Sequence, residues 1–348
     1  MPKRPDFEIA DTKIKAGTRD VVNLPLPGMY THTPLGMPIH VIHGRKEGPT
    51  IFISAAIHGD EINGVEIIRR VLSLTALKRL KGTLLAVPIV NVMGFHNHSR
   101  YLPDRRDLNR SFPGREAGTL AGRLASTFMT QVVMRSDLGI DLHTAAIHRD
   151  NFPQIRADLN DEKIAPLAKA FGSPVLLHSA APEGSLRTAA ANESVSMMVF
   201  EAGEALRFDE VSIRVGASGI INVLRELGML PMPKRKPPKH AALLRSSIWV
   251  RAPQSGILRA QVKLGSMVSK GDQLGVIADP IGQMDQALNA PSNGIVIGRT
   301  NIPLVYEGEA MFHIGRTHQT SLLEQHLDTL QDSEMLEAPE MVEEPAIV

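Results

Sequence analysis

The chain contains no cysteine, and this absence limits the chemistry open to it. Among 348 residues there is no thiol that could form a disulfide or act as a thiolate nucleophile. A bound zinc ion would therefore have to be held by histidine and carboxylate side chains alone.

Long hydrophobic runs and an excess of charge are missing as well. Residues 1–8 lack the apolar stretch of a secretory signal peptide, and no run approaches the ~20 apolar residues of a membrane-spanning helix. The formal net charge of +1 gives no reason to expect nucleic acid as a partner. These absences predict a cytoplasmic protein with neither a membrane nor a nucleic-acid partner.

An alternation of strand-like and helix-like stretches occupies the middle of the chain. Short strands are expected first, at 18–24 and 38–42, and the alternation begins near Pro49. Alternation of this kind predicts an α/β sheet covered on both faces. The expected strands are 50–57, 83–90, 138–142, 175–177 and 196–200, and the expected helices are 64–74, 118–135, 162–171 and 212–227.

Changes in composition divide the chain into five segments. Prolines and like charges after Leu230 are typical of a linker, and the acidic C-terminal tail, which holds one amphipathic stretch at 321–330, is expected to be partly disordered. The segments are an N-terminal β segment (1–45) packing on an α/β domain (46–230), the linker (231–243), a β-sandwich domain (244–316) and the tail (317–348).

The segment after the linker contains an internal repeat. The pattern APxxGI occurs at Ala252–Ile257 and again at Ala290–Ile295, among short strand-like stretches and glycine turns. Two copies of one pattern indicate a pseudo-symmetric all-β barrel-sandwich. The segment resembles biotinyl/lipoyl carrier domains, but the stretch 279–286, where a carrier has its modified lysine, contains no lysine. We therefore expect the carrier fold without the carrier function.

Two fragments that each follow an apolar run carry the candidate metal ligands. They are His58-Gly59-Asp60-Glu61 and Asp141-Leu142-His143-Thr144. Gly59 lets the backbone turn after His58, and Glu61 is expected to begin a helix, which brings the two side chains to one side. Two histidines and one carboxylate leave a coordination position open for water, as in catalytic zinc sites. The plainer alternative is a loop histidine beside a carboxylate that the helix dipole favours. Outside these motifs, four histidines are expected to be loop or hydrogen-bonded residues: His96, His98, His148 and His178.

A long loop rich in arginine follows the expected strand at 83–90. It runs from Ser99 to Gly114 and is too rich in guanidinium groups to be only a connection. Arginine binds carboxylates through two hydrogen bonds and can polarise a carbonyl oxygen. The alternative is a solvated basic loop.

Glu201 ends a strongly apolar strand at 196–200. A carboxylate in that position is costly unless it has a partner or a task. Partial burial would raise its pKa and suit it to act as a general base on a zinc-bound water. The alternative is an ordinary acid at a strand end, and Glu204 is the nearest competitor for the role.

Four motifs occur in one order: His58-x-x-Glu61, Asp107-Leu108-Asn109-Arg110, Asp141-Leu142-His143 and Phe200-Glu201-x-Gly203. In this combination the chain resembles the succinylglutamate desuccinylase/aspartoacylase family, relatives of the zinc carboxypeptidases, over about residues 35–315. The resemblance implies an α/β fold with a carboxypeptidase-like mixed sheet flanked by helices. It also implies one zinc ion per chain, bound by His58, Glu61 and His143.

The same resemblance implies roles for further residues. Glu201 is the expected general base and proton shuttle, and Arg100 is expected to polarise the scissile carbonyl. Asn109 and Arg110 are expected to hold the free carboxylate of the substrate, and Tyr306 in Tyr306-Glu307 to cover the site. The segment between Arg100 and Asp107 is longer than in animal aspartoacylases, which leaves the substrate open.

We therefore expect a zinc-dependent hydrolase that cleaves the amide bond of a small N-acyl amino acid and not a peptide bond. One alternative is a zinc carboxypeptidase that trims C-terminal residues from peptides with the same centre. A second is a non-catalytic interaction protein with a decayed site. The acyl group, the amino acid and the oligomeric state, including a homo-oligomer, are not determined by these patterns.

Overall fold

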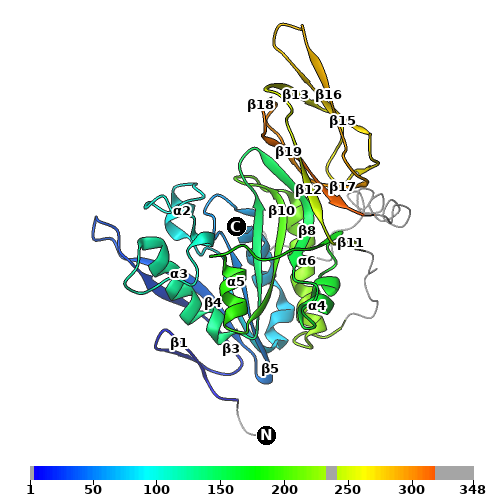
Figure 1. Ribbon diagram of the computed structural model, residues 1–348. Coiled ribbons are helices and arrows are strands. Elements are labelled where there is room, and N and C mark those ends of the chain that lie inside the picture. The colour runs from blue at the N-terminus through cyan, green and yellow to red at the C-terminus, as the bar shows by residue number, and fades with distance from the viewer. Residues whose placement is uncertain (1–3, 233–240, 318–348) are drawn as a thin grey trace, which may run out of the picture.

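The computed structural model describes residues 4–232 and 241–317, and its centre is one large mixed β-sheet (Figure 1). The linker residues 233–240 and the tail from 318, where the amphipathic stretch 321–330 was expected, lie outside the described residues. The strands of the sheet are β3 (Thr18–Leu26), β4 (Leu35–His43), β5 (Lys46–Ala55), β6 (Lys81–Val87), β7 (Leu138–Ala145), β8 (Arg149–Ala157), β9 (Val175–His178), β10 (Ser196–Glu204), β11 (Ala242–Leu244), β12 (Ser247–Arg251), β14 (Met267–Val268), β17 (Gly294–Thr300) and β19 (Ala310–Arg316).

The main path through the sheet is β12-β19-β17-β8-β10-β7-β5-β6-β4-β3. Its centre is parallel, because β10, β7, β5 and β6 pair in one direction. Helices cover both faces there, so these strands are apolar on both sides. Every residue of β7 is buried, including Asp141 and His143, and such polar groups need partners inside the protein.

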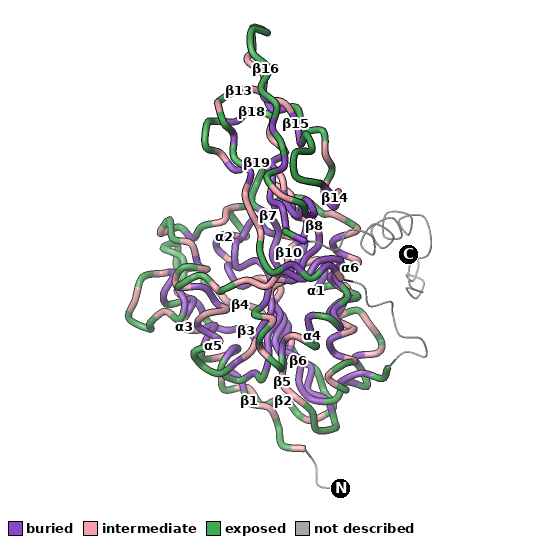
Figure 2. The backbone as a smooth tube through the Cα atoms, turned by 45° about the vertical axis from the view of Figure 1, so that its right-hand side comes forward, coloured by how far each residue is buried: buried purple, intermediate pink, exposed green. Residues whose placement is uncertain are grey.

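Helices form a layer on each face of the sheet (Figures 1 and 2). On one face, α1 (Asn63–Ser73), α4 (Ile164–Phe171) and α6 (Glu210–Glu226) share a hydrophobic cluster with the strands. On the other, α3 (Leu120–Gln131) and α5 (Leu186–Asn192) belong to a second cluster. The α/β class expected from the alternating pattern is confirmed. No helix of the described residues is long and apolar enough to cross a membrane.

Several local expectations differ from the structure. The sequence pattern missed β8, α5 and the short helix α2 (Val92–His96). The helix expected at 118–135 is shorter, because α3 ends at Gln131 and a 3-10 turn follows at Val133–Arg135. Glu61 does not begin a helix: α1 starts at Asn63, and Glu61 lies in the turn before it. The N-terminal strands β3 and β4 extend the main sheet through β6.

The C-terminal region consists of two β layers, one of which continues the main sheet (Figure 1). Strands β17, β19 and β12 continue the main sheet beyond β8. A separate antiparallel sheet contains β16 (Asp285–Asn289), β15 (Gln273–Ala278), β13 (Gly256–Ala260) and β18 (Leu304–Val305). A hydrophobic cluster that includes Leu258, Ile277 and Phe312 draws residues from both layers. The two copies of the repeat lead into β13 and β17.

Candidate metal centre and active-site cavity

His58 and Glu61 lie in the turn that joins β5 to α1. The backbone nitrogen of Glu61 donates to the carbonyl oxygen of His58 over 3.1 Å, which brings both side chains to the same side of the turn. Gly59 permits this turn, since a Cβ on it would come within 2.0 Å of the carbonyl carbon of Gly94 in α2. Only glycine allows the two backbones to approach so closely.

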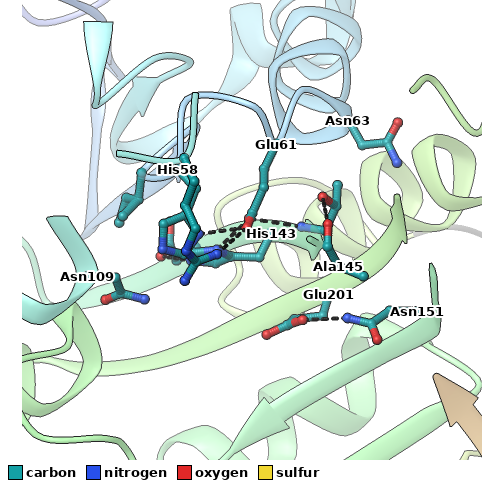
Figure 3. Close-up of polar contacts among 12 residues, drawn as sticks. His58, Glu61, Asn63, Asn109, His143, Ala145, Asn151 and Glu201 are labelled. Carbon is teal, nitrogen blue, oxygen red and sulfur yellow. Dashed lines mark hydrogen bonds and ion pairs between the residues drawn. The ribbon is translucent and has the colours of Figure 1, made fainter. Parts of the chain in front are cut away.

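His143 meets this turn from β7, the parallel neighbour of β5. The candidate ligand atoms of His58, Glu61 and His143 all lie within 4.8 Å of one another, and the three side chains converge in Figure 3. Each residue is buried, at 4, 2 and 6% exposure. Carboxyl ends of neighbouring parallel strands are the usual place for a ligand site in such sheets.

The hydrogen-bond partners orient both histidines toward Glu61. Nδ1 of His58 and Nδ1 of His143 each lie 2.7 Å from a different carboxylate oxygen of Glu61. Nε2 of His58 lies 3.1 Å from Asp107 Oδ1, and Nε2 of His143 lies 2.6 Å from Asp141 Oδ2. A carboxylate on the far nitrogen is the common arrangement for metal-binding histidines, because it sets the tautomer and the ring orientation.

Charges in this cluster compensate one another. Burial by itself would raise the pKa of Glu61, but His58 and His143 hold that pKa well below its usual range. Burial by itself would lower the pKa of His143, but Asp141 and Glu61 raise it. The cluster thus keeps a carboxylate ionised in a desolvated place. A buried carboxylate between two imidazoles fits the donor set of a catalytic zinc ion.

Arg100 lies beside this cluster. Its Nη1 is 3.3 Å from Glu61 Oε1, and its Nη2 is 2.9 Å from Asp107 Oδ2. Asp107 therefore connects the arginine loop to the cluster through both Arg100 and His58. The guanidinium is placed where it could meet a developing negative charge.

Asn109 and Arg110 follow in a 3-10 turn (Leu108–Arg110). Asn109 Oδ1 accepts from the backbone nitrogen of Leu186 in α5 over 2.9 Å, so the turn is attached to the neighbouring helix. Arg110 is exposed, and its Nη1 donates to the carbonyl oxygen of Asn109 over 2.6 Å. Both residues line the same cavity as the histidine cluster.

Glu201 lies on β10, paired in register with His143 on β7. Its carboxylate accepts from Asn151 Nδ2 over 2.7 Å and lies 3.1 Å from Arg156 Nη1. Glu204, by contrast, accepts from the backbone nitrogen of His148 and does not line the cavity. The geometry thus favours Glu201 over Glu204 as the carboxylate that can meet a substrate.

These residues surround one cavity of about 480 Å³, a size suited to a small molecule. Tyr306 is 79% exposed and is not part of its lining, so the structure does not bring it to the other predicted residues. The four alternative histidines also lie outside the lining: His96, His98, His148 and His178.

The C-terminal strands supply one wall of the cavity, through residues that no sequence motif indicated. Trp249 of β12 stacks on His313 of β19 with ring centroids 4.2 Å apart, and both line the cavity. Burial and then the positive charge of Arg156 lower the pKa of His313 to about 3, so its ring is neutral. Trp249 is the only tryptophan of the chain, and this was the one feature of the sequence that could have pointed to this wall of the cavity.

Sequence and structure comparisons agree on one group of relatives. The model of the succinylglutamate desuccinylase/aspartoacylase catalytic domain matches residues 47–227. The N-alpha-acetyl-L-2,4-diaminobutyric acid deacetylase of Halomonas elongata is 27% identical over 254 residues, which cover 70% of this chain and 74% of that protein.

Two solved structures have a similar fold. The product-bound ectoine utilization protein EutE (DoeB) from Ruegeria pomeroyi gives a TM-score of 0.79 at 25% identity, covering 91% of this chain and 99% of that one. A succinylglutamate desuccinylase/aspartoacylase from Rhodobacter sphaeroides gives 0.75 at 24% identity, covering 85 and 95%.

Proposed function

Because the chain belongs to the succinylglutamate desuccinylase/aspartoacylase family, we propose that it is a zinc-dependent hydrolase that cleaves the amide bond of a small N-acyl amino acid. One observation carries the proposal: the buried cluster of His58, Glu61 and His143 opens on the cavity that Arg100 and Glu201 also line. A metal-binding cluster, a cation for the oxyanion and a carboxylate for proton transfer are the parts that amide hydrolysis requires.

His58, Glu61 and His143 would hold one zinc ion per chain. When bound, such an ion polarises a carbonyl oxygen and lowers the pKa of a water molecule. Asp107 and Asp141 keep the two imidazoles in the orientation that presents Nδ1 to the centre.

Other residues that line the cavity would bind the substrate, stabilise developing charge and transfer protons. Glu201 accepts a proton from the attacking water and then delivers it to the leaving amine. Arg100, held by Glu61 and Asp107, stabilises the negative charge that develops on the carbonyl oxygen. Asn109 and Arg110 hold the free carboxylate and so place the amide for attack.

The C-terminal region would limit the size of the substrates that enter the cavity. We assign a carrier-like fold to a domain at 244–316, which joins the catalytic domain at 46–230 through the main sheet. The turn between β15 and β16 contains no lysine, so no attachment of biotin or lipoate is expected. Trp249 and His313 line one side of the cavity, and this wall would favour small acyl amino acids over long peptides.

Hydrolysis of a substrate panel with zinc present tests this function. The panel contains N-acetyl, N-succinyl and N-formyl amino acids beside dipeptides, and includes N-acetyl-diaminobutyrate because the Halomonas relative is named for that compound. We expect N-acyl amino acids to be cleaved faster than dipeptides. Faster cleavage of dipeptides would favour a carboxypeptidase, and no cleavage by zinc-loaded protein would contradict the proposal.

A further inference from the structure

Both oxygens of the Glu201 carboxylate are held by side chains of the neighbouring strand. Asn151 Nδ2 donates to Oε2 over 2.7 Å, a contact drawn in Figure 3, and Arg156 Nη1 lies 3.1 Å from Oε1. In the antiparallel pairing of β8 with β10, Gln154 lies opposite Glu201. Asn151 precedes Gln154 along β8 and Arg156 follows it, so the two side chains reach the Glu201 carboxylate from opposite directions along the strand.

The strand that carries this pair is itself attached to the C-terminal strand β17. Gln154 is fully buried, and its Nε2 donates to the carbonyl oxygen of Ile297 over 3.0 Å. Its Oε1 accepts from Arg156 Nε over 3.4 Å. Asn151 pairs with Gly298, where a Cβ would come within 2.9 Å of Asn151 Oδ1. Side chain and backbone contacts thus restrict both partners of Glu201.

We propose that Asn151 and Arg156 are positioning residues, which hold the Glu201 carboxylate in the orientation that proton transfer requires. The inference rests on the proposed function, in which Glu201 is the general base. A general base must lie within hydrogen-bond reach of the proton it accepts. A displacement of about 1 Å in an active site can lower the rate by ~10²-fold. A charge-assisted contact from Arg156 and an amide hydrogen bond from Asn151 together restrict the rotation of the Glu201 carboxylate.

A double-mutant cycle tests this coupling. Arg156→Met and Asn151→Ala are each made in the natural chain and in a Glu201→Gln background, and steady-state kinetics are measured with the best substrate of the panel. In the natural chain we expect kcat to fall by ~10- to 100-fold, with KM changed by less than about threefold. In the Glu201→Gln background the same substitutions should change the residual rate by less than about twofold, because no proton transfer to the side chain remains to be positioned.

Two further variants separate positioning from a general loss of structure. Arg156→Lys keeps the charge and should recover part of the kcat lost in Arg156→Met. Arg259→Met is the matched control, since Arg259 forms an exposed ion pair of 3.0 Å with Asp285 in the outer C-terminal sheet. It should leave kcat and KM unchanged. Zinc content, the melting temperature and the dissociation constant of the product amino acid, measured for each variant, should stay near those of the natural chain.

The outcomes distinguish the inference from the function on which it rests. Equal losses in both backgrounds, or a loss confined to KM, would overturn the positioning role while the deacylase function stands. A natural chain without hydrolytic activity would instead refute the function. Should Arg156→Met fail to fold, the Asn151→Ala cycle decides the matter by the same criterion.

Discussion

The buried charges of the His58, Glu61 and His143 cluster have partners of opposite sign, so single substitutions there should have large and specific effects. Glu61 is 2% exposed and lies against two imidazoles and one guanidinium. Removing one member of such a group leaves the others buried and unpaired, which costs more than the contact itself.

His143→Ala should sharply lower the zinc content of protein purified without chelator, because it removes one of the three proposed ligands. Metal analysis by mass spectrometry measures the ratio of zinc to chain. The control is His96→Ala, since His96 is exposed and lies outside the cavity. Unchanged zinc in His143→Ala would contradict the ligand assignment.

Glu201→Gln should keep the metal and lose most activity, because the amide cannot accept a proton from water. Loss of a general base typically lowers the rate by ~10²–10⁴-fold. Glu204→Gln is the matched control, since Glu204 is bound by the backbone of His148 and by Asn301 outside the cavity. Near-full turnover in Glu201→Gln beside an inactive Glu204→Gln would mean that the base is Glu204.

His313 should make stability fall as the solution becomes acidic. Its folded-state pKa is about 3, whereas an unfolded histidine has a pKa of about 6.5. Between these values the unfolded chain binds a proton that the folded chain does not, so the stabilisation is complete above about pH 6.5 and is lost as pH falls toward 3. The loss is at most ~1.4 kcal/mol per pH unit.

Melting temperatures between pH 6.5 and 4.5 measure this effect. The natural chain should lose stability more steeply than His313→Gln, which has no titrating ring there. His96→Gln serves as a control that should keep the steeper slope. Parallel slopes for the natural chain and His313→Gln would show that the His313 ring accepts a proton in the folded state.

At the scale of the element, two of the four arginines in the loop from Ser99 to Gly114 have different surroundings at the cavity. Arg100 is held between Glu61 and Asp107, whereas Arg110 is exposed at the cavity. We therefore expect Arg100→Ala to act mainly on kcat and Arg110→Ala mainly on KM. Steady-state kinetics on one substrate measure both. A reversed pattern would exchange the two roles.

The sequence of β8 explains why this strand was not predicted. Its sequence contains Pro153 and three charged residues, which obscure the alternation of a strand. The structure tolerates the proline where β8 changes neighbours: Arg149 to Asn151 pair with β17, and Gln154 to Ala157 pair with β9. Pairing between distant segments, rather than local propensity, makes this stretch a strand. For the same reason, Asn151 and Arg156 were not among the predicted site residues.

At the scale of the whole molecule, the C-terminal region is part of the main sheet. β17 covers the edge of β8, and β11 pairs with β9. A hydrophobic cluster joins both parts, with Val175 and Leu177 on one side and Ile295 and Ile297 on the other. Loss of the C-terminal region would expose the edges of β8 and β9 and the apolar surface of this cluster, and such exposure promotes aggregation.

Deletion of residues 240–348 should therefore yield an aggregating or poorly folded chain. Size-exclusion chromatography and circular dichroism measure the outcome, beside a control that lacks only residues 318–348. The shorter deletion leaves every described strand in place and should behave as the full chain. A monomeric, cooperatively melting product of the longer deletion would show that the catalytic domain folds alone.

The sequence by itself determined the family, the α/β class and the group of residues His58, Glu61 and His143, because motifs and hydrophobic periodicity are local patterns. Only the tertiary structure decided what surrounds them. Strand pairing placed Glu201 rather than Glu204 in the cavity, attached it to β8 and left Tyr306 exposed. These contacts join segments far apart in the chain, and their geometry follows from register and packing across the sheet, which no local pattern encodes.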